Sequence, residues 1–217
     1  MKLALLSGAA AGPLFILAVL IQDYSRSGFD PRVHMLSLLS LGTLGWIQVA
    51  NFVLCGLLNV FYSAGLRRHL KGTKGGATSS FLICVYGLGL ILVGLFRTDP
   101  ANGFPPGMPP VTHPSAHGVV HALGALVIFI TLSTALISLG RSFAARNERG
   151  WSLYCLSSAI AMLAIFFTGF VYPAVTARTL RLAVLAGWSA ASIIAVRLLN
   201  DRPRCRSPLS ERIALTF

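Results

Sequence analysis

The chain alternates between long apolar runs and short segments that carry its charged residues. Six runs contain no Asp, Glu, Lys or Arg: 3–22, 33–66, 75–96, 100–140, 150–177 and 182–196. A helix rises about 1.5 Å per residue, so it crosses the ~30 Å hydrocarbon core of a bilayer with about 20 apolar residues. The pattern therefore predicts an all-α, polytopic membrane protein with six transmembrane helices.

The predicted spans belong to a single helical-bundle domain that covers residues 1–217, and they lie at about 3–22, 43–66, 78–96, 116–140, 151–173 and 179–199. The 100–116 connection holds six of the eleven prolines. Because proline lacks a backbone N–H and fixes φ, we expect a stiff external strap there. Ser115 is predicted to cap the fourth span, and residues 35–40 to form a short helix in the membrane interface.

Composition supports the same class. The chain is 55% hydrophobic and 11% charged, with a mean hydropathy of +0.74, whereas soluble domains carry roughly 25% charged residues. These values exclude a disordered chain and a soluble nucleic-acid binder. Cys55, Cys84 and Cys155 fall within predicted spans and Cys205 in the tail, so we interpret the cysteines as small apolar fillers rather than as a disulfide framework.

The net charge of +12 predicts an orientation and no nucleic-acid partner. Most of the 18 Lys and Arg residues gather at Lys2, in two connections and in the tail, at 67–74, 141–149 and 197–212. Because short loops rich in Lys and Arg stay in the cytoplasm, both termini are predicted to be cytoplasmic. We expect a multi-pass protein of the cell membrane.

A polar stripe runs along the second span. Gln48, Asn51, Cys55 and Asn59 follow one another at spacings of three or four residues, and such residues share one face of a helix. That face is expected to point into the bundle, because polar groups in contact with lipid are costly. Gln48 and Asn51 lie nearer the external end, where they are predicted to orient histidines as outer-shell partners.

The fourth span begins with a histidine pair. His117 and His121 are four residues apart, which places both imidazoles on one helix face at a spacing that can bind one metal ion. The alternative is two interfacial histidines that hydrogen-bond to the backbone or to other spans.

The predicted topology brings further ionisable residues to the same membrane face. Asp99 ends the third span, and Asp30 and His34 lie in the first external connection. We expect a polar cavity near the external leaflet, roofed by residues 100–116. In it, His117 and His121, with Asp99 or His34, are predicted to hold a zinc ion that activates water. Asp99 and Asp30 are the candidate catalytic acids.

The order of these features resembles the bacterial membrane-protein family catalogued as domain of unknown function 998. The resemblance covers most of the chain and rests on Gly12-Pro13-Leu14-Phe15, Asp30-Pro31, Leu36-Ser37-Leu38-Leu39-Ser40, the 45–57 segment with Trp46, Gln48 and Asn51, Gly94-Leu95-Phe96-Arg97-Thr98-Asp99-Pro100, and Gly118-Val119-Val120-His121. It implies a membrane-embedded bundle and carries no established activity.

A more distant analogy links the chain to membrane hydrolases of the alkaline ceramidase and adiponectin receptor type. Those enzymes use a zinc ion, a serine, an aspartate and three histidines, two of them four apart on one helix. Asp99, His117, His121 and His34 resemble that set, with Ser37 or Ser40 as the serine. Six spans instead of seven, and a histidine pair on the fourth span instead of the last, depart from the pattern.

Three functions remain open from the sequence. The first is a zinc-dependent hydrolase of a lipid or other amphiphile with an external-leaflet site. The second is a non-enzymatic membrane module that binds a lipid or a partner. The third is acid-catalysed isoprenoid chemistry, in which a desolvated Asp99 or Asp30 donates the proton. Each takes a membrane lipid or an amphiphilic small molecule as its partner, and the sequence does not specify an oligomeric state.

Overall fold

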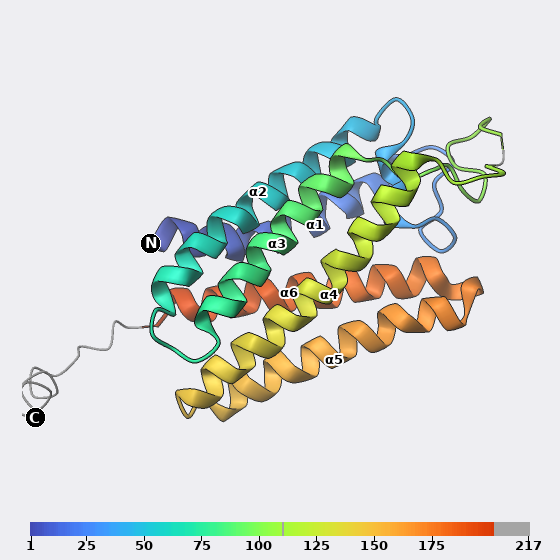
Figure 1. The fold of residues 1–217 in the computed structure, drawn as a ribbon. Helices are drawn as coiled ribbons and strands as arrows, with labels where there is room; N and C mark the ends of the chain where they lie inside the picture. Colours follow the sequence, from blue (N-terminus) through green and yellow to red (C-terminus); the bar gives the residue numbers. More distant parts are fainter. Residues whose placement is uncertain (110, 202–217) are drawn as a thin grey trace, which may run out of the picture.

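A computed structural model of the chain describes residues 1–109 and 111–201 (Figure 1). The described chain is all-α apart from one isolated bridge between Ala101 and Phe104. It contains six long helices and two short 3-10 helices: α1 (Lys2–Ser25), η1 (Leu36–Ser40), α2 (Gly45–His69), α3 (Gly76–Leu95), α4 (Ala116–Ala145), α5 (Arg149–Val171), η2 (Pro173–Val175) and α6 (Thr176–Leu199). Six helices are long and apolar enough to cross a membrane, which confirms the predicted number.

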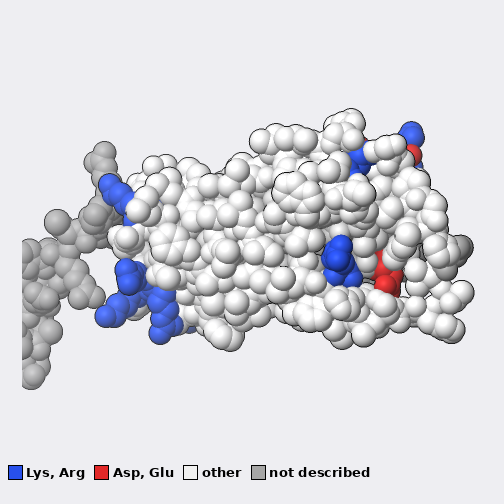
Figure 2. Space-filling view, turned by 90° about the horizontal axis from the view of Figure 1, so that it is seen from above, with Lys and Arg blue, Asp and Glu red and all other residues white. Residues whose placement is uncertain are grey.

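The six helices form a closed ring in chain order. Each helix packs on the one before it, and α6 returns to pack on α1, as Figure 1 shows. We call the end that holds the start of α1, the connections 70–75 and 146–148, and the end of α6 the basic end. The opposite end, with the connections 26–44, 96–115 and 172–175, is the strap end. In Figure 2 a wide uncharged band separates the charged residues of the two ends.

Three helices run past the ends predicted for them. The first, second and fourth spans were expected to end near residues 22, 66 and 140, whereas α1 continues to Ser25, α2 to His69 and α4 to Ala145. The prediction stopped at charged residues, but Asp23 stays inside α1 because Arg181 pairs with it. The basic tail residues Arg202, Arg204, Arg206 and Arg212, and Cys205, lie outside the described residues.

Glycines allow α1 to approach both of its neighbours closely. A Cβ atom on Gly8 would lie 2.5 Å from the ring of Tyr62 on α2, and one on Gly12 would lie 2.8 Å from the backbone oxygen of Trp188 on α6. Both distances are far shorter than a van der Waals contact. The small residues of α1 therefore close the ring, since larger side chains would force α2 or α6 outward.

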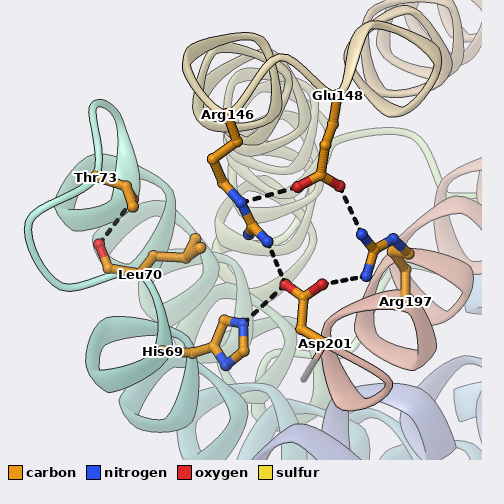
Figure 3. Close-up of polar contacts among 7 residues, drawn as sticks. All are labelled: His69, Leu70, Thr73, Arg146, Glu148, Arg197 and Asp201. Carbon is orange, nitrogen blue, oxygen red and sulfur yellow. Dashed lines mark hydrogen bonds and ion pairs between the residues drawn. The ribbon is translucent and has the colours of Figure 1, made fainter. Parts of the chain in front are cut away.

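A network of charges joins three parts of the chain at the basic end (Figure 3). Asp201, which follows α6, lies 2.5 Å from Arg146 Nη2 and 3.3 Å from His69 Nε2, and it also pairs with Arg197. Glu148 bridges the two arginines at 2.9 and 2.6 Å. The network ties α2, the α4–α5 connection and α6 together where no strap covers the bundle.

The strap end is closed by the 26–44 connection. The short helix predicted for residues 35–40 is present as η1, and all five of its residues are buried against the bundle. Its place in the membrane interface stays a prediction. Arg26 holds η1 from outside, donating to the carbonyls of Leu39 and Leu41 at 3.1 and 2.5 Å, while its guanidinium lies over the ring of Phe104 in the 100–116 strap. Burial lowers the pKa of Arg26.

Candidate functional site

The ring encloses a cavity of about 580 Å³ near the strap end, lined by residues of all six helices. Its floor is formed where Gly187 packs against Met162 and Leu132. Its roof includes Met35, Leu36 and Ser37. The 100–116 strap was expected to form that roof. Phe104 of the strap instead packs on Phe29 and His34 of the 26–44 connection, so the strap is the second layer above the cavity.

The cavity reaches the outer surface of the ring between α4 and α5. Leu123 on α4 and Phe167 and Phe170 on α5 line it, yet they are 60%, 49% and 66% exposed. In Figure 1 the ribbon of α4 runs away from that of α5 toward the strap end, beyond the stacked rings of Phe129 and Phe166, whose centroids are 4.1 Å apart. The opening therefore faces the side of the bundle, where lipid chains would lie in a membrane.

The lining is apolar, which corrects the expectation of a polar cavity. No Asp, Glu, Lys or Arg is among the lining residues, and most are aliphatic or aromatic; the polar exceptions are Ser37, Tyr86, Thr98, His121, Thr176 and Trp188. The expectation was wrong because the acids that were to supply the polarity, Asp99 and Asp30, are engaged in the connections of the strap end, as described below.

His121 is the predicted site residue that lines this cavity from α4. Its side chain is buried, and its Nδ1 lies 2.8 Å from the carbonyl oxygen of Phe96 and 3.1 Å from that of Val93. Carbonyls at the end of a helix such as α3 lack intrahelical partners and can only accept. Nδ1 therefore carries the proton, and Nε2 is left as a hydrogen-bond acceptor.

His117, the other member of the pair, is exposed one turn before His121. Its ring lies beside that of Phe96, with centroids 5.2 Å apart. Both histidines thus contact Phe96 at the end of α3, but His121 is buried and His117 is exposed. The alternative given above, interfacial histidines bonded to backbone, describes His121.

Asp99 closes the strap into a loop. Its two carboxylate oxygens accept hydrogen bonds from the backbone N–H and the hydroxyl of Ser115, at 2.9 and 2.5 Å. The same hydroxyl accepts from Gly118 N at 3.0 Å, which confirms Ser115 as the cap of α4. The hydrogen bonds from Ser115 hold the pKa of Asp99 below its ordinary value. Asp99 and Ser115 thus form a clasp across residues 100–114.

Opening this clasp should expose the strap to proteolysis. For Asp99→Ala we expect cleavage by proteinase K within residues 100–114 several times faster than in the wild type at pH 7. Because the pKa of Asp99 is lowered in the folded protein, its contribution is present above the ordinary value of about 3.9 and is lost as the pH falls through the folded-state pKa. Asp30→Ala, which removes another exposed acid of the same end, should leave the rate unchanged. Equal rates in the two variants would contradict the clasp.

Asp30 and His34 serve the 26–44 connection. Asp30 is exposed and lies 3.0 Å from Arg32, whose hydrogen bonds lower the pKa of Asp30 to about 2. His34 is buried beside the rings of Phe29 and Phe104. Its Nδ1 accepts from the backbone N–H of Asp30 at 2.9 Å, so Nε2 carries the proton and donates to the carbonyl oxygen of Asn102 at 3.0 Å. Both ring nitrogens are engaged.

The predicted zinc ligands do not form a donor set. Within residues 1–109 and 111–201, no group of three or more His, Cys, Asp or Glu side chains could hold a metal ion. His34 has no free ring nitrogen, His121 offers one, and both oxygens of Asp99 bind Ser115. The residues present do not fit a zinc ion in this arrangement, and the zinc site stays a prediction.

The polar stripe of α2 is buried, as expected, but it serves the packing of α1 against α2. Gln48 Oε1 accepts from Gln22 Nε2 at 2.8 Å, and Asn51 Nδ2 donates to the Phe15 carbonyl at 3.2 Å. Among the described residues, neither side chain forms a hydrogen bond with a histidine, although both were predicted to orient histidines. Of the two candidate serines, Ser40 donates to the backbone oxygen of Ser37 at 2.7 Å, and Ser37 lines the cavity.

Sequence reasoning missed four polar residues of the lining: Tyr86, Thr98, Thr176 and Trp188. Tyr86 on α3 and Trp188 on α6 are 1% and 3% exposed and line the cavity. Among the described residues, neither the hydroxyl nor the indole N–H has a hydrogen-bond partner. A signal was available for these two, since each is an aromatic residue with a polar atom in the middle of an apolar span, where such a group needs a partner.

Comparison with known proteins identifies one family. The family model described as "Protein of unknown function (DUF998)" matches residues 9–199. No curated protein matches the chain, and no solved structure matches it.

Proposed function

The chain belongs to the DUF998 family, and we propose that it is a membrane-embedded binding protein that holds a single amphiphile in the cavity inside its ring of helices. The observation that carries this proposal is the cavity itself. About 580 Å³ of space with an apolar lining and one buried histidine falls within the ~300–1,000 Å³ range of small-molecule sites, which are mostly apolar with a few fixed polar groups.

The lateral opening supports a ligand that arrives from the bilayer. The exposed lining residues Leu123, Phe167 and Phe170 border the opening, so an apolar chain can enter without crossing water. A chain that moves from lipid into such a cavity gains little hydrophobic free energy, because both surroundings are apolar. Close packing and the polar contacts of the lining must then supply the preference for one ligand.

The chemical alternatives have less support. A hydrolase or an acid-catalysed isoprenoid enzyme needs an acid or a metal ion next to the bound substrate. Asp99 and Asp30 are not among the lining residues and are held by Ser115 and Arg32. Binding is therefore the function that the arrangement favours, and the metal-dependent hydrolase remains an untested prediction.

Blocking the cavity should remove the ligand. Protein extracted from membranes in mild detergent is expected to carry a co-purified amphiphile in native mass spectra, at close to one per chain. Ala125→Trp, which fills space in the lining of α4, should reduce the occupancy at least fivefold. Ala161→Trp, at an exposed position of α5 outside the cavity, should retain it. An empty wild type, or equal occupancy in both variants, would reject the proposal.

The proposal includes an orientation, with the basic end in the cytoplasm of a bacterial cell and the opening in the outer leaflet of its cell membrane. The Lys and Arg residues of the α2–α3 connection and the arginines of the charge network, which also lies at the basic end, support this orientation. A cysteine placed at position 113 should react with a membrane-impermeant maleimide in intact cells, and one placed at position 71 only after lysis. The reverse pattern would invert the assignment.

A further inference from the structure

Resting on the binding function proposed above, we propose that the cavity selects an uncharged amphiphile whose head group donates a hydrogen bond, such as a long-chain alcohol or an N–H amide, over a lipid with a charged head. Three properties of the lining support this selection: its lack of charge, the protonation state of His121, and a continuous wall of aromatic rings.

The lining cannot balance a charged head group. It contains no Asp, Glu, Lys or Arg, and a buried charge without a partner is costly. A buried ion pair, Arg181 with Asp23 at 2.5 Å, lies close to the cavity. Phe15, Leu36 and Val184 line both the cavity and a small pocket beside Arg181. These side chains therefore lie between the ion pair and the cavity. Within that pair the two charges cancel, so the pair offers no net attraction to an anion or to a cation.

The protonation state of His121 favours a ligand that donates a hydrogen bond. Nδ1–H donates to the carbonyls of Phe96 and Val93, so Nε2 is the ring atom that can accept a hydrogen bond from a partner. An alcohol or an N–H amide can donate to Nε2. A carboxylate can only accept, and an ester has no donor, so both would leave this nitrogen without a hydrogen bond.

An aromatic wall connects His121 to the floor of the cavity. Successive rings are in contact, with centroid distances of 6.4, 5.5, 4.8 and 5.5 Å, in the order His121, Phe52, Phe15, Trp188 and Tyr86. Tyr86 precedes Val93, a carbonyl partner of His121, by seven residues on α3, which corresponds to about 10 Å along the helix axis. A head group at His121 therefore leaves a long apolar surface for a chain.

The deep end of the wall carries two further polar groups, the hydroxyl of Tyr86 and the indole N–H of Trp188, which have no hydrogen-bond partner in the part of the chain that the structure describes. Both can donate. They would meet a second acceptor in the ligand chain or a water molecule, and neither adds a charge. The cavity thus offers uncharged hydrogen-bonding groups at both levels.

Competition in a matched ligand series tests the selection. The full-length protein in nanodiscs is labelled with a 16-carbon alcohol that carries a diazirine near its far end, and the labelled peptides are mapped. We expect label on the floor segments of α4 and α5. Unlabelled hexadecanol should compete about tenfold better than methyl palmitate, since the ester lacks the donor, and at least tenfold better than palmitate or hexadecyltrimethylammonium.

The outcomes separate the two proposals. Absence of label in the cavity would reject the binding function, and this inference with it. Label that palmitate or the ammonium compound displaces as well as hexadecanol does would overturn the inference and leave the binding function standing. His121→Asn, which can still donate to the Phe96 carbonyl, should compress the alcohol-to-ester ratio toward one. Should this variant fail to fold, the ligand series on the wild type decides by itself.

Discussion

Asp23→Ala is expected to lower the free energy of unfolding by about 3–5 kcal/mol, the range for breaking a buried ion pair by removing one partner. Asp23 and Arg181 have side-chain exposures of 4% and 14% and join the strap ends of α1 and α6. Without Asp23 the guanidinium stays buried among apolar side chains, and its Nε and second NH2 group already lack partners among the described residues. The ring would then be weakest where α6 returns to α1.

Two control variants test whether the loss in Asp23→Ala comes from an unpaired buried charge. Replacing both partners, as in Asp23→Leu/Arg181→Met, should recover most of the loss, because well-packed apolar residues often substitute for a buried pair. Asp30→Ala, which breaks the exposed pair with Arg32, should cost at most about 1 kcal/mol. Thermal unfolding in detergent should show a decrease of about 6–20 °C for Asp23→Ala, at roughly 2–4 °C per kcal/mol for a chain of this size. A decrease no larger than that of Asp30→Ala would contradict the role given to the buried pair.

Asp201→Asn is expected to cost about 2–3 kcal/mol and to remove a pH dependence. Asp201 accepts from Arg146, Arg197 and His69, whose side chains are 14–24% exposed, so the loss should stay below that of a fully buried pair. Burial alone would raise the pKa of Asp201, but the hydrogen bonds from Arg146, Arg197 and His69 hold it below its ordinary value. This stabilisation is therefore present above about pH 3.9 and decreases as the pH falls through the folded-state pKa.

Unfolding curves between pH 7 and pH 3 check this prediction. The wild type should lose stability toward pH 3, and the difference between the wild type and Asp201→Asn should shrink over the same range. Arg141→Ala removes an exposed charge of the same end and should change the stability by no more than about 0.5 kcal/mol at any pH. A difference that stays constant from pH 7 to pH 3 would show that Asp201 does not carry the acid sensitivity.

The candidate site was predicted less well than the fold, and the reason lies in hydrogen bonding. The sequence suggested that Asp99, His34, His117 and His121 share one chamber, because the topology brings them to one end of the bundle. In the structure both ring nitrogens of His34 form hydrogen bonds with backbone groups, Asp99 binds Ser115, and His121 binds the end of α3. These three side chains each bond to a nearby backbone group or cap, whereas His117 lies exposed beside the ring of Phe96. Of the four, only His121 lines the cavity.

The number of membrane-crossing helices, the burial of the polar stripe on α2, the cap at Ser115 and the family were all predictable from the amino-acid sequence. All depend on local periodicity, composition or short motifs. The closure of the ring by α6 on α1, the pairing of Asp23 with Arg181, and the apolar cavity lined by Tyr86, Trp188 and His121 became visible only in the folded molecule. These pairings join residues up to 184 positions apart. Helix packing selects them through shape and close contact, and a lipid-facing helix and a cavity-facing helix can have the same apolar sequence.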